Sequence, residues 1–260
     1  GTKTVSSSYS IDPSTVLTRT NTGNSTALIT YGTSSRVIEM SLQCWYDNYT
    51  VNTSGQKVYT LKSAADLFEL KELIEIGDIA STIGHEHLLH TGTGIASDDF
   101  EGAIVKLGAN ITIESGQTLA MIGNATNYFK GTFDGNGYAI INANFISDST
   151  GRVGLFGYIP ETSTIENLIF SGDTSITIPN TVGGDVYASL VCAINDGTIT
   201  NCANGSIVKI TNNSSTANVI FGAIVGKNNA GKTVSGCYNM QLIKANNESM
   251  NISGIIGKNL

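Results

Sequence analysis

The segment GLFGYI at residues 154–159 decides the fold, because it recurs along the chain together with STIENL at residues 163–168. The later passes read SLVCAI at 189–194 with GTITNC at 197–202, GAIVGK at 222–227 with KTVSGC at 232–237, and GIIGKN at 254–259. Leu168, Cys202 and Cys237 end successive passes and lie 34 and then 35 residues apart. A fixed period of this length indicates a solenoid or a propeller.

Each repeat unit holds about three short strand-forming runs with Gly and Asn at the corners, which fits one coil of a three-faced parallel β-helix. We therefore predict an all-β protein, a right-handed parallel β-helix (β-solenoid). In our alignment Ser189 and Cys192 stand where the first pass has Gly154 and Gly157. The fourth pass stops after its first strand, so we expect the array to continue beyond residue 260. The aligned repeat positions are Gly154, Gly157, Leu168, Cys192, Cys202, Gly226, Cys237 and Gly257.

The composition supports this fold and excludes several functions. Charged residues make up only 13% of the chain, which contains 29 glycines, whereas helical surfaces normally carry many charges. The net charge of -7 and the three arginines make nucleic acid an unsuitable partner. No apolar run reaches the length of a membrane span, and the four cysteines lack zinc-site spacing. The many Asn-x-Ser/Thr triplets favour a secreted context only weakly.

One helix is predicted near the start of the repeats. Residues 63–66 resemble a capping box, and apolar residues then follow at helical spacing until Gly77. We predict a helix over 64–76 that caps the open end of the solenoid and turns its polar face to water. Residues 1–57 are interpreted as a β-rich leader or the end of a preceding module, and 58–260 as the capped solenoid.

The repeats resemble the GLUG-type repeat of bacterial surface and secreted proteins, including non-catalytic regions of some immunoglobulin-A peptidases. The resemblance covers about residues 58–260 and includes the helix and the segment FKGTFDGNGY at 129–138. It implies an extracellular location, at the cell surface or secreted, and brings no catalytic residues.

Three polar segments have residue types that metal sites or tight turns use. His85, His87 and His90 are candidate metal ligands, but they miss the H-E-x-x-H pattern, so a solvated loop is the simpler interpretation. Calcium is a candidate at an acidic cluster that lacks EF-hand spacing. The cluster consists of Asp98, Asp99 and Glu101. The third segment, which we interpret as a turn, consists of Asp134, Gly135, Asn136 and Gly137.

The repeats also predict stacked rows of side chains. Cys202 and Cys237 should stack on an interior face and stay reduced. Asparagines at the corners are expected to form amide ladders; they include Asn167, Asn195, Asn201, Asn228 and Asn239. By contrast, we expect the acids from Gly154 onward not to align between coils, and the threonines to form no regular T-x-T row.

These observations favour a non-catalytic extracellular module, an adhesin or stalk that presents a binding surface. Its partners would be a host glycan or extracellular protein, together with the rest of a larger parent chain. A carbohydrate-active β-helix enzyme is the alternative, with Trp45, Tyr46, Tyr49, Tyr128 and Tyr158 as sugar platforms. A further alternative is an accessory region of a secreted peptidase.

Overall fold

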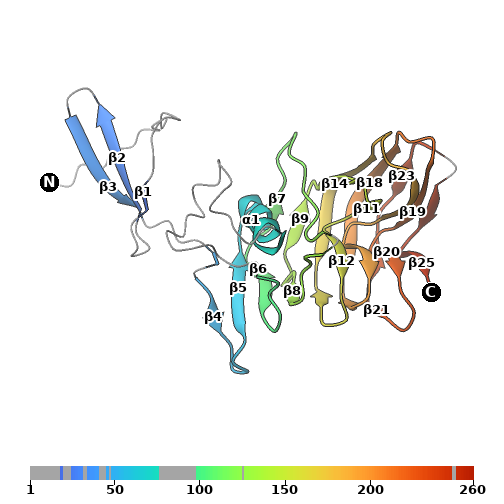
Figure 1. The fold of residues 1–260 in the computed structure, drawn as a ribbon, viewed down its shortest axis with the longest axis horizontal. Coiled ribbons are helices and arrows are strands. Elements are labelled where there is room, and N and C mark those ends of the chain that lie inside the picture. Colours follow the sequence, from blue (N-terminus) through green and yellow to red (C-terminus); the bar gives the residue numbers. More distant parts are fainter. Residues whose placement is uncertain are drawn as a thin grey trace.

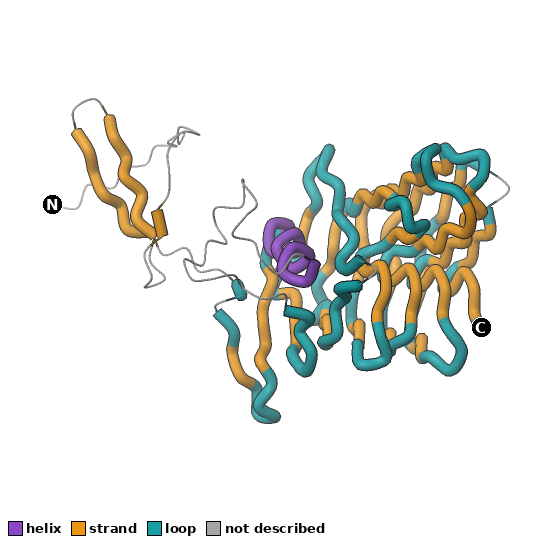
Figure 2. Tube along the Cα trace, in the orientation of Figure 1, coloured by secondary structure: helices purple, strands orange, loops and turns teal. Residues whose placement is uncertain are grey.

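The computed structural model describes residues 18–19, 25–31, 34–40, 45–46, 48–75, 98–124, 126–247 and 250–260. Strands of successive coils stack side by side along the long axis of the molecule, with one helix near the N-terminal end of the stack (Figure 1). Coloured by secondary structure, the stack consists of strands joined by short loops (Figure 2). The predicted parallel β-solenoid is confirmed.

The solenoid has four walls, each a sheet whose neighbouring strands come from neighbouring coils. Sheet 1 contains β4 (Thr50–Val51), β5 (Lys57–Leu61), β6 (Ile104–Leu107), β8 (Thr132–Asp134), β13 (Thr164–Glu166), β17 (Thr198–Thr200) and β21 (Thr233–Ser235). Sheet 2 contains β7 (Ile111–Thr112), β9 (Ala139–Ile141), β10 (Asn144–Ile146), β14 (Ile169–Ile178), β18 (Ala203–Asn212), β22 (Tyr238–Asn239) and β23 (Ile243–Ala245).

Two four-stranded sheets complete the walls. Sheet 3 contains β11 (Arg152–Val153), β15 (Gly184–Ala188), β19 (Ala217–Gly222) and β24 (Asn251–Ser253). Sheet 4 contains β12 (Phe156–Ile159), β16 (Cys192–Asn195), β20 (Val225–Asn228) and β25 (Ile256–Asn259). A full coil therefore has four strands, as in β16 to β19, and the expectation of three faces was wrong. A bend at Ala223 and Ile224 separates β19 from β20, although the sequence indicated a single strand-forming run at 222–227.

An antiparallel sheet of three strands precedes the solenoid. It consists of β1 (Thr18–Arg19), β2 (Ser25–Tyr31) and β3 (Ser34–Met40). Within the solenoid, β4 pairs antiparallel with β5, whereas the other pairs of the four walls are parallel. The segment at 118–122, which also has β-type sequence, contributes one isolated bridge between Ile122 and Phe156 and no strand.

The register confirms the predicted period and corrects one alignment. Ile165 pairs with Ile199, which pairs with Val234, so this row has the predicted spacings of 34 and 35 residues. Cys192, however, pairs with Phe156 and not with Gly157. The second coil is one residue longer between Ala188 and Cys192 than the first is between Val153 and Phe156. Gly157, Ala193 and Gly226 therefore occupy equivalent positions in successive coils, which we call the small-residue position. Ala193 lies next to Gly226 of the following coil.

The helix α1 (Ala64–Glu75) covers one end of the core, as predicted. Its capping box forms, since the Asp66 N–H donates to Ser63 Oγ at 3.2 Å and the Ser63 N–H donates to Asp66 Oδ2 at 3.2 Å. The apolar face is buried against the first coils; it consists of Leu67, Leu70, Leu73 and Ile74. The polar face departs from expectation at Glu69, which is buried and accepts a 2.7 Å hydrogen bond from Trp45 Nε1.

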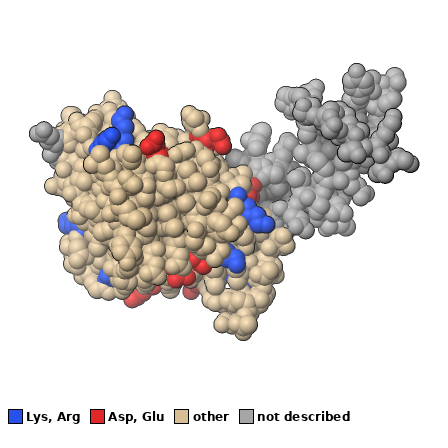
Figure 3. All heavy atoms as spheres, turned by 180° about the vertical axis from the view of Figure 1, so that it is seen from behind, with Lys and Arg blue, Asp and Glu red and all other residues tan. Residues whose placement is uncertain are grey.

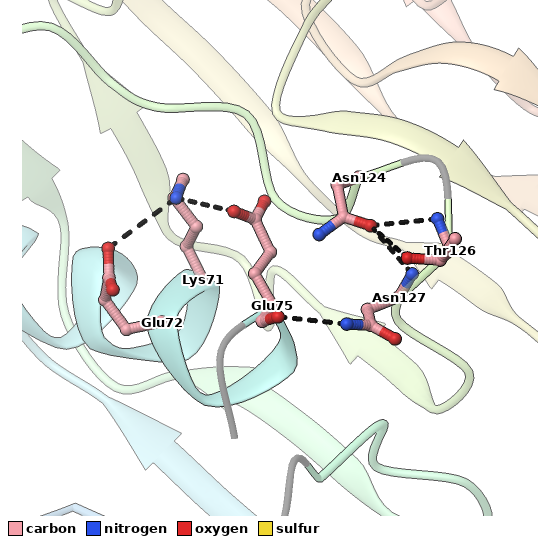
Figure 4. Close-up of polar contacts among 6 residues, drawn as sticks. All are labelled: Lys71, Glu72, Glu75, Asn124, Thr126 and Asn127. Atoms are coloured by element: carbon pink, nitrogen blue, oxygen red, sulfur yellow. Dashed lines mark hydrogen bonds and ion pairs between the residues drawn. The ribbon is translucent and has the colours of Figure 1, made fainter. Parts of the chain in front are cut away.

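Side chains also hold the C-terminal end of α1 (Figure 4). Lys71 Nζ lies 2.7 Å from Glu75 Oε2, one turn further along the helix, and 3.6 Å from Glu72 Oε1. The side-chain amide of Asn127 donates to the Glu75 carbonyl at 2.9 Å, which satisfies one of the carbonyls that a helix end leaves unpaired. The loop that holds Asn127 is itself closed by Asn124, which accepts the Asn127 N–H at 2.9 Å. The cap is thus joined to the loop before β8.

The predicted turn lies between β8 and β9. Asn136 and Gly137 have φ angles of 52° and 79°, a region that suits Asn and Gly. The Asn136 N–H donates to Asp134 Oδ1 at 2.7 Å, and the Tyr138 N–H donates to the Gly135 carbonyl at 2.8 Å. Within the described residues, no helix has the length and apolar character needed to cross a bilayer.

Candidate functional site

A row of four threonines lies on the outer face of sheet 1. Thr132, Thr164, Thr198 and Thr233 pair in register on β8, β13, β17 and β21. Each precedes a residue that packs inward, so the alternation of a strand places the four hydroxyl-bearing side chains outside. As expected, these strands form no regular T-x-T row, because only β17 reads Thr-Ile-Thr. The single row was not predicted, although Thr164, Thr198 and Thr233 hold the same position in STIENL, GTITNC and KTVSGC.

A second row on the same face contains charged residues. Lys106, Asp134, Glu166, Thr200 and Ser235 pair in register on the same succession of strands. In the register, the acids from Gly154 onward pair with non-acidic residues, as expected: Glu166 with Thr200, Asp173 with Ile207 and Asp185 with Asn218. Glu166 does, however, lie directly opposite Asp134 on the preceding strand. The expectation covered the acids from Gly154 onward. It did not cover Asp134, which lies in the preceding coil.

The two carboxylates have different environments. Asp134 Oδ1 accepts the Asn136 N–H and, at 2.9 Å, the side-chain amide of Asn167. Burial and the nearby Asp134 charge raise the pKa of Glu166. Neighbouring strands are about 4.8 Å apart, so the two carboxyl groups can approach the separation used by retaining glycosidases. This face can therefore offer hydroxyls along its length and a carboxylate pair at one place.

The structure places the earlier calcium candidates in protein contacts. Asp99 Oδ2 lies 2.7 Å from Lys130 Nζ, and Glu101 lies 3.8 Å from the same ammonium. Asp98 Oδ2 accepts the Tyr46 hydroxyl at 2.7 Å. Among the described residues, no group of three or more His, Cys, Asp or Glu side chains is arranged to hold a metal ion. His85, His87 and His90 lie outside the described residues.

Two of the five proposed sugar platforms, Trp45 and Tyr46, have other roles. Trp45 is 7% exposed and stacks with Phe100 in the core, and Tyr46 stacks on Tyr59 with ring centroids 5.4 Å apart. Trp45 and Tyr46 therefore help to close the N-terminal end of the solenoid, and their assignment as platforms was wrong. Tyr49 is 42% exposed and has Lys57 Nζ 4.7 Å from its ring centroid.

The predicted cysteine stack is present. The Tyr238 N–H donates to the Cys202 carbonyl at 3.0 Å, so Cys202 and Cys237 are neighbours across successive coils. Cys202 is fully buried and Cys237 half-buried, and both thiols are free. A hydrogen bond with Cys202 lowers the pKa of Cys237 to about 7, although burial acts in the opposite direction. Burial raises the pKa of Cys192, which is also free.

The surface seen from behind has few charges over its broad central part, and charged side chains gather toward its margins (Figure 3). Such a surface suits contacts made by hydroxyl, amide and aromatic groups more than strong electrostatic attraction.

Comparison with known proteins gives a structural likeness. No family model matches the chain, and no curated protein matches it. A solved structure, described as "Crystal structure of a putative immunoglobulin A1 protease from Bacteroides ovatus", is similar with a TM-score of 0.46 and 15% sequence identity. The likeness covers 81% of this chain and 63% of that one, so this chain corresponds to less than two thirds of that structure. The GLUG-type repeat and the function stay predictions.

Proposed function

We propose that this chain is a non-catalytic extracellular module, a stiff stalk that presents its outer faces for binding. Stiffness is supported by the register, because parallel strands of successive coils pair residue by residue from β6 to β25. The interior is filled by side chains that are fully buried, such as Phe133, Ile165 and Ile199. Close-packed interiors of this kind resist bending.

The threonine row is the observation that carries the binding part of the proposal. Its members stand about 4.8 Å apart along one face, each held by its strand, and hydroxyl groups both donate and accept hydrogen bonds. A ligand that meets such a face does not have to order it first, which lowers the entropic cost of binding. Extended glycans and extended peptide segments both present repeated hydrogen-bonding groups that could match the row.

The test is binding of the chain to a panel of glycans and extracellular matrix proteins, with calcium and with chelator. The variant Thr164→Val/Thr198→Val removes two hydroxyls from the middle of the row and keeps the β-branched shape. Thr177→Val/Thr211→Val, on the neighbouring strands β14 and β18 of sheet 2, is a matched control that removes two half-buried, in-register hydroxyls elsewhere. Loss of binding in the first variant alone supports the proposal, whereas equal binding by both variants contradicts a role for the row.

A carbohydrate-active enzyme is the second candidate, and the register of Asp134 with Glu166 favours it. The raised pKa of Glu166 suits a general acid, and Asp134 is the second carboxyl group of the pair. Release of shortened saccharides by the chain, lost in both Glu166→Gln and Asp134→Asn, would establish catalysis. Absence of products from a broad polysaccharide panel would leave the non-catalytic module.

A further inference from the structure

Sheets 3 and 4 carry two rows of side chains that belong to neither row of sheet 1. On sheet 4, Tyr158, Ile194, Lys227 and Lys258 pair in register on β12, β16, β20 and β25. On sheet 3, Arg152, Tyr187, Ile220 and Asn251 do so on β11, β15, β19 and β24. The rows meet where Lys227 Nζ lies 5.6 Å from the centroid of the Tyr187 ring. We call Arg152, Tyr158, Tyr187, Lys227 and Lys258 the tyrosine–lysine array.

The array concentrates positive charge that is not neutralised by direct ion pairs. Lys227 and Lys258 are directly opposite each other on neighbouring strands, an arrangement in which like charges repel. In the part of the chain that the structure describes, Lys130 and Lys232 pair with carboxylates, whereas no cation of the array has one within 4.0 Å.

The closest acids in this region already have partners. Asp185 accepts the side-chain amide of Asn218 at 2.9 Å and the Tyr187 hydroxyl at 3.3 Å. The hydrogen bond from Asn218 and the charge of Lys258 hold the pKa of Asp185 below its usual range, so it stays ionised and offsets part of the lysine charge. Asp196, which accepts the Tyr158 hydroxyl, is the second carboxylate at the array. The three cations against these two carboxylates leave a net charge of about +1 at the array. An anionic ligand would relieve the repulsion between the two lysines.

The tyrosine rings of the array are held in place. Tyr158 donates its hydroxyl to Asp196 Oδ2 at 2.8 Å, and Asn229 donates to the other oxygen of Asp196 at 2.7 Å. The Tyr158 ring also meets Tyr128 edge to face, with centroids 5.1 Å apart. An anchored ring is an apolar platform that loses little entropy on binding, which suits the C–H faces of sugars.

We propose that the tyrosine–lysine array binds a polysaccharide chain whose sugars carry carboxylate or sulfate groups. Sugar faces lie on Tyr158 and Tyr187, and the anionic groups meet Lys227, Lys258 and Arg152. The rows run along the solenoid axis, which favours a linear polymer over a compact ligand. Nucleic acid is disfavoured, because three cations are few against the 6–10 phosphate contacts that are typical of strong binding and the chain has a net charge of -7. The inference deepens the proposed function and rests on it.

Two double variants of equal charge test the array. Lys227→Gln/Lys258→Gln removes its lysine pair. Lys209→Gln/Lys244→Gln removes another pair of lysines that are in register on neighbouring strands, β18 and β23 of sheet 2. Binding of the full chain to polygalacturonate, heparin and neutral dextran is measured by calorimetry at two salt concentrations, with circular dichroism to verify folding.

The array predicts that Lys227→Gln/Lys258→Gln weakens binding of at least one anionic polymer by about tenfold or more, while Lys209→Gln/Lys244→Gln changes it by less than about twofold. Preference for polygalacturonate identifies carboxylates, and preference for heparin identifies sulfates. Equal losses in both double variants, or no binding of either anionic polymer, would overturn the inference. If the chain then still binds a neutral glycan or a matrix protein through the threonine row, the proposed function stands without the array.

Discussion

Asn195 donates its side-chain amide to Oδ1 of Asn228, one coil further along the solenoid, at 2.7 Å. Asn228 in turn donates to Asn259 Oδ1 at 2.9 Å and to the Lys232 carbonyl at 3.1 Å. Both Asn195 and Asn228 are buried. The ladder therefore fixes the register of sheet 4, because a slip of one residue would leave buried amides without partners.

Replacing the middle of this ladder should destabilise the fold. Asn228→Ala leaves the Asn195 amide buried without an acceptor, and we expect a loss of about 1–3 kcal/mol in the free energy of unfolding. Asn218→Ala interrupts the exposed row formed by Asp185, Asn218 and Asn251, and should cost less than about 0.5 kcal/mol. Urea unfolding measures both. Equal costs would mean that burial of the ladder is unimportant.

Gly226, which lies next to Ala193 at the small-residue position, should not accept a larger side chain. A Cβ at Gly226 would lie 2.7 Å from the Ala193 carbonyl oxygen and 2.9 Å from the Ala188 nitrogen, so Gly226→Ala forces two strands apart. We expect a loss of about 1–3 kcal/mol in thermal or urea unfolding. Gly254→Ala is the matched control, because a Cβ there meets nothing within 4 Å. A neutral Gly226→Ala would contradict the close packing of sheets 3 and 4.

Cys237 should react as a thiolate near neutral pH, and Cys192 and Cys202 should not react in the folded protein. The hydrogen bond from Cys202 favours the ionised form of Cys237, with a pKa of about 7. Alkylation without reductant, mapped by mass spectrometry, should label Cys237 with a rate that rises through pH 7. In Cys202→Ala the rise should move toward about pH 8.5. Absence of label at Cys237 unless reductant is added would instead indicate a disulfide.

Removing the charge of Glu166 should stabilise the protein at neutral pH. Its pKa is raised in the folded state, so the stability contributed by this group is present at low pH and declines as pH rises through the folded pKa. Glu166→Gln removes the cost of partly burying a carboxylate and the repulsion with Asp134, together about 0.5 kcal/mol, and should raise Tm slightly at pH 7 but not at pH 4. Glu114→Gln, at an exposed glutamate, should show no such gain. A lower Tm at pH 7 would mean that Glu166 is stabilising as a carboxylate.

The sequence predicted the parts of the fold that depend on local pattern. The period, α1 and the asparagine ladder follow from the recurrence of GLFGYI-like segments and from the capping box at Ser63. Features that depend on register across unequal loops were missed. The pairing of Cys192 with Phe156 can be recognised only when the extra residue between Ala188 and Cys192 is located. Thr132 and the Asp134–Glu166 pair can be recognised only when the coil before Gly154 is aligned with the repeats. Trp45 was misassigned because its partner Glu69 lies on a helix face that sequence pattern marks as polar.

The central claim, a non-catalytic module that binds through its outer faces, is tested most directly by one titration. The full chain is titrated with a panel of polysaccharides and matrix proteins, and the polysaccharides are then analysed for new reducing or unsaturated ends. We predict saturable binding of at least one member of the panel with every polymer intact. Shortened polymers that disappear with Glu166→Gln and Asp134→Asn would contradict the claim and make the chain an enzyme.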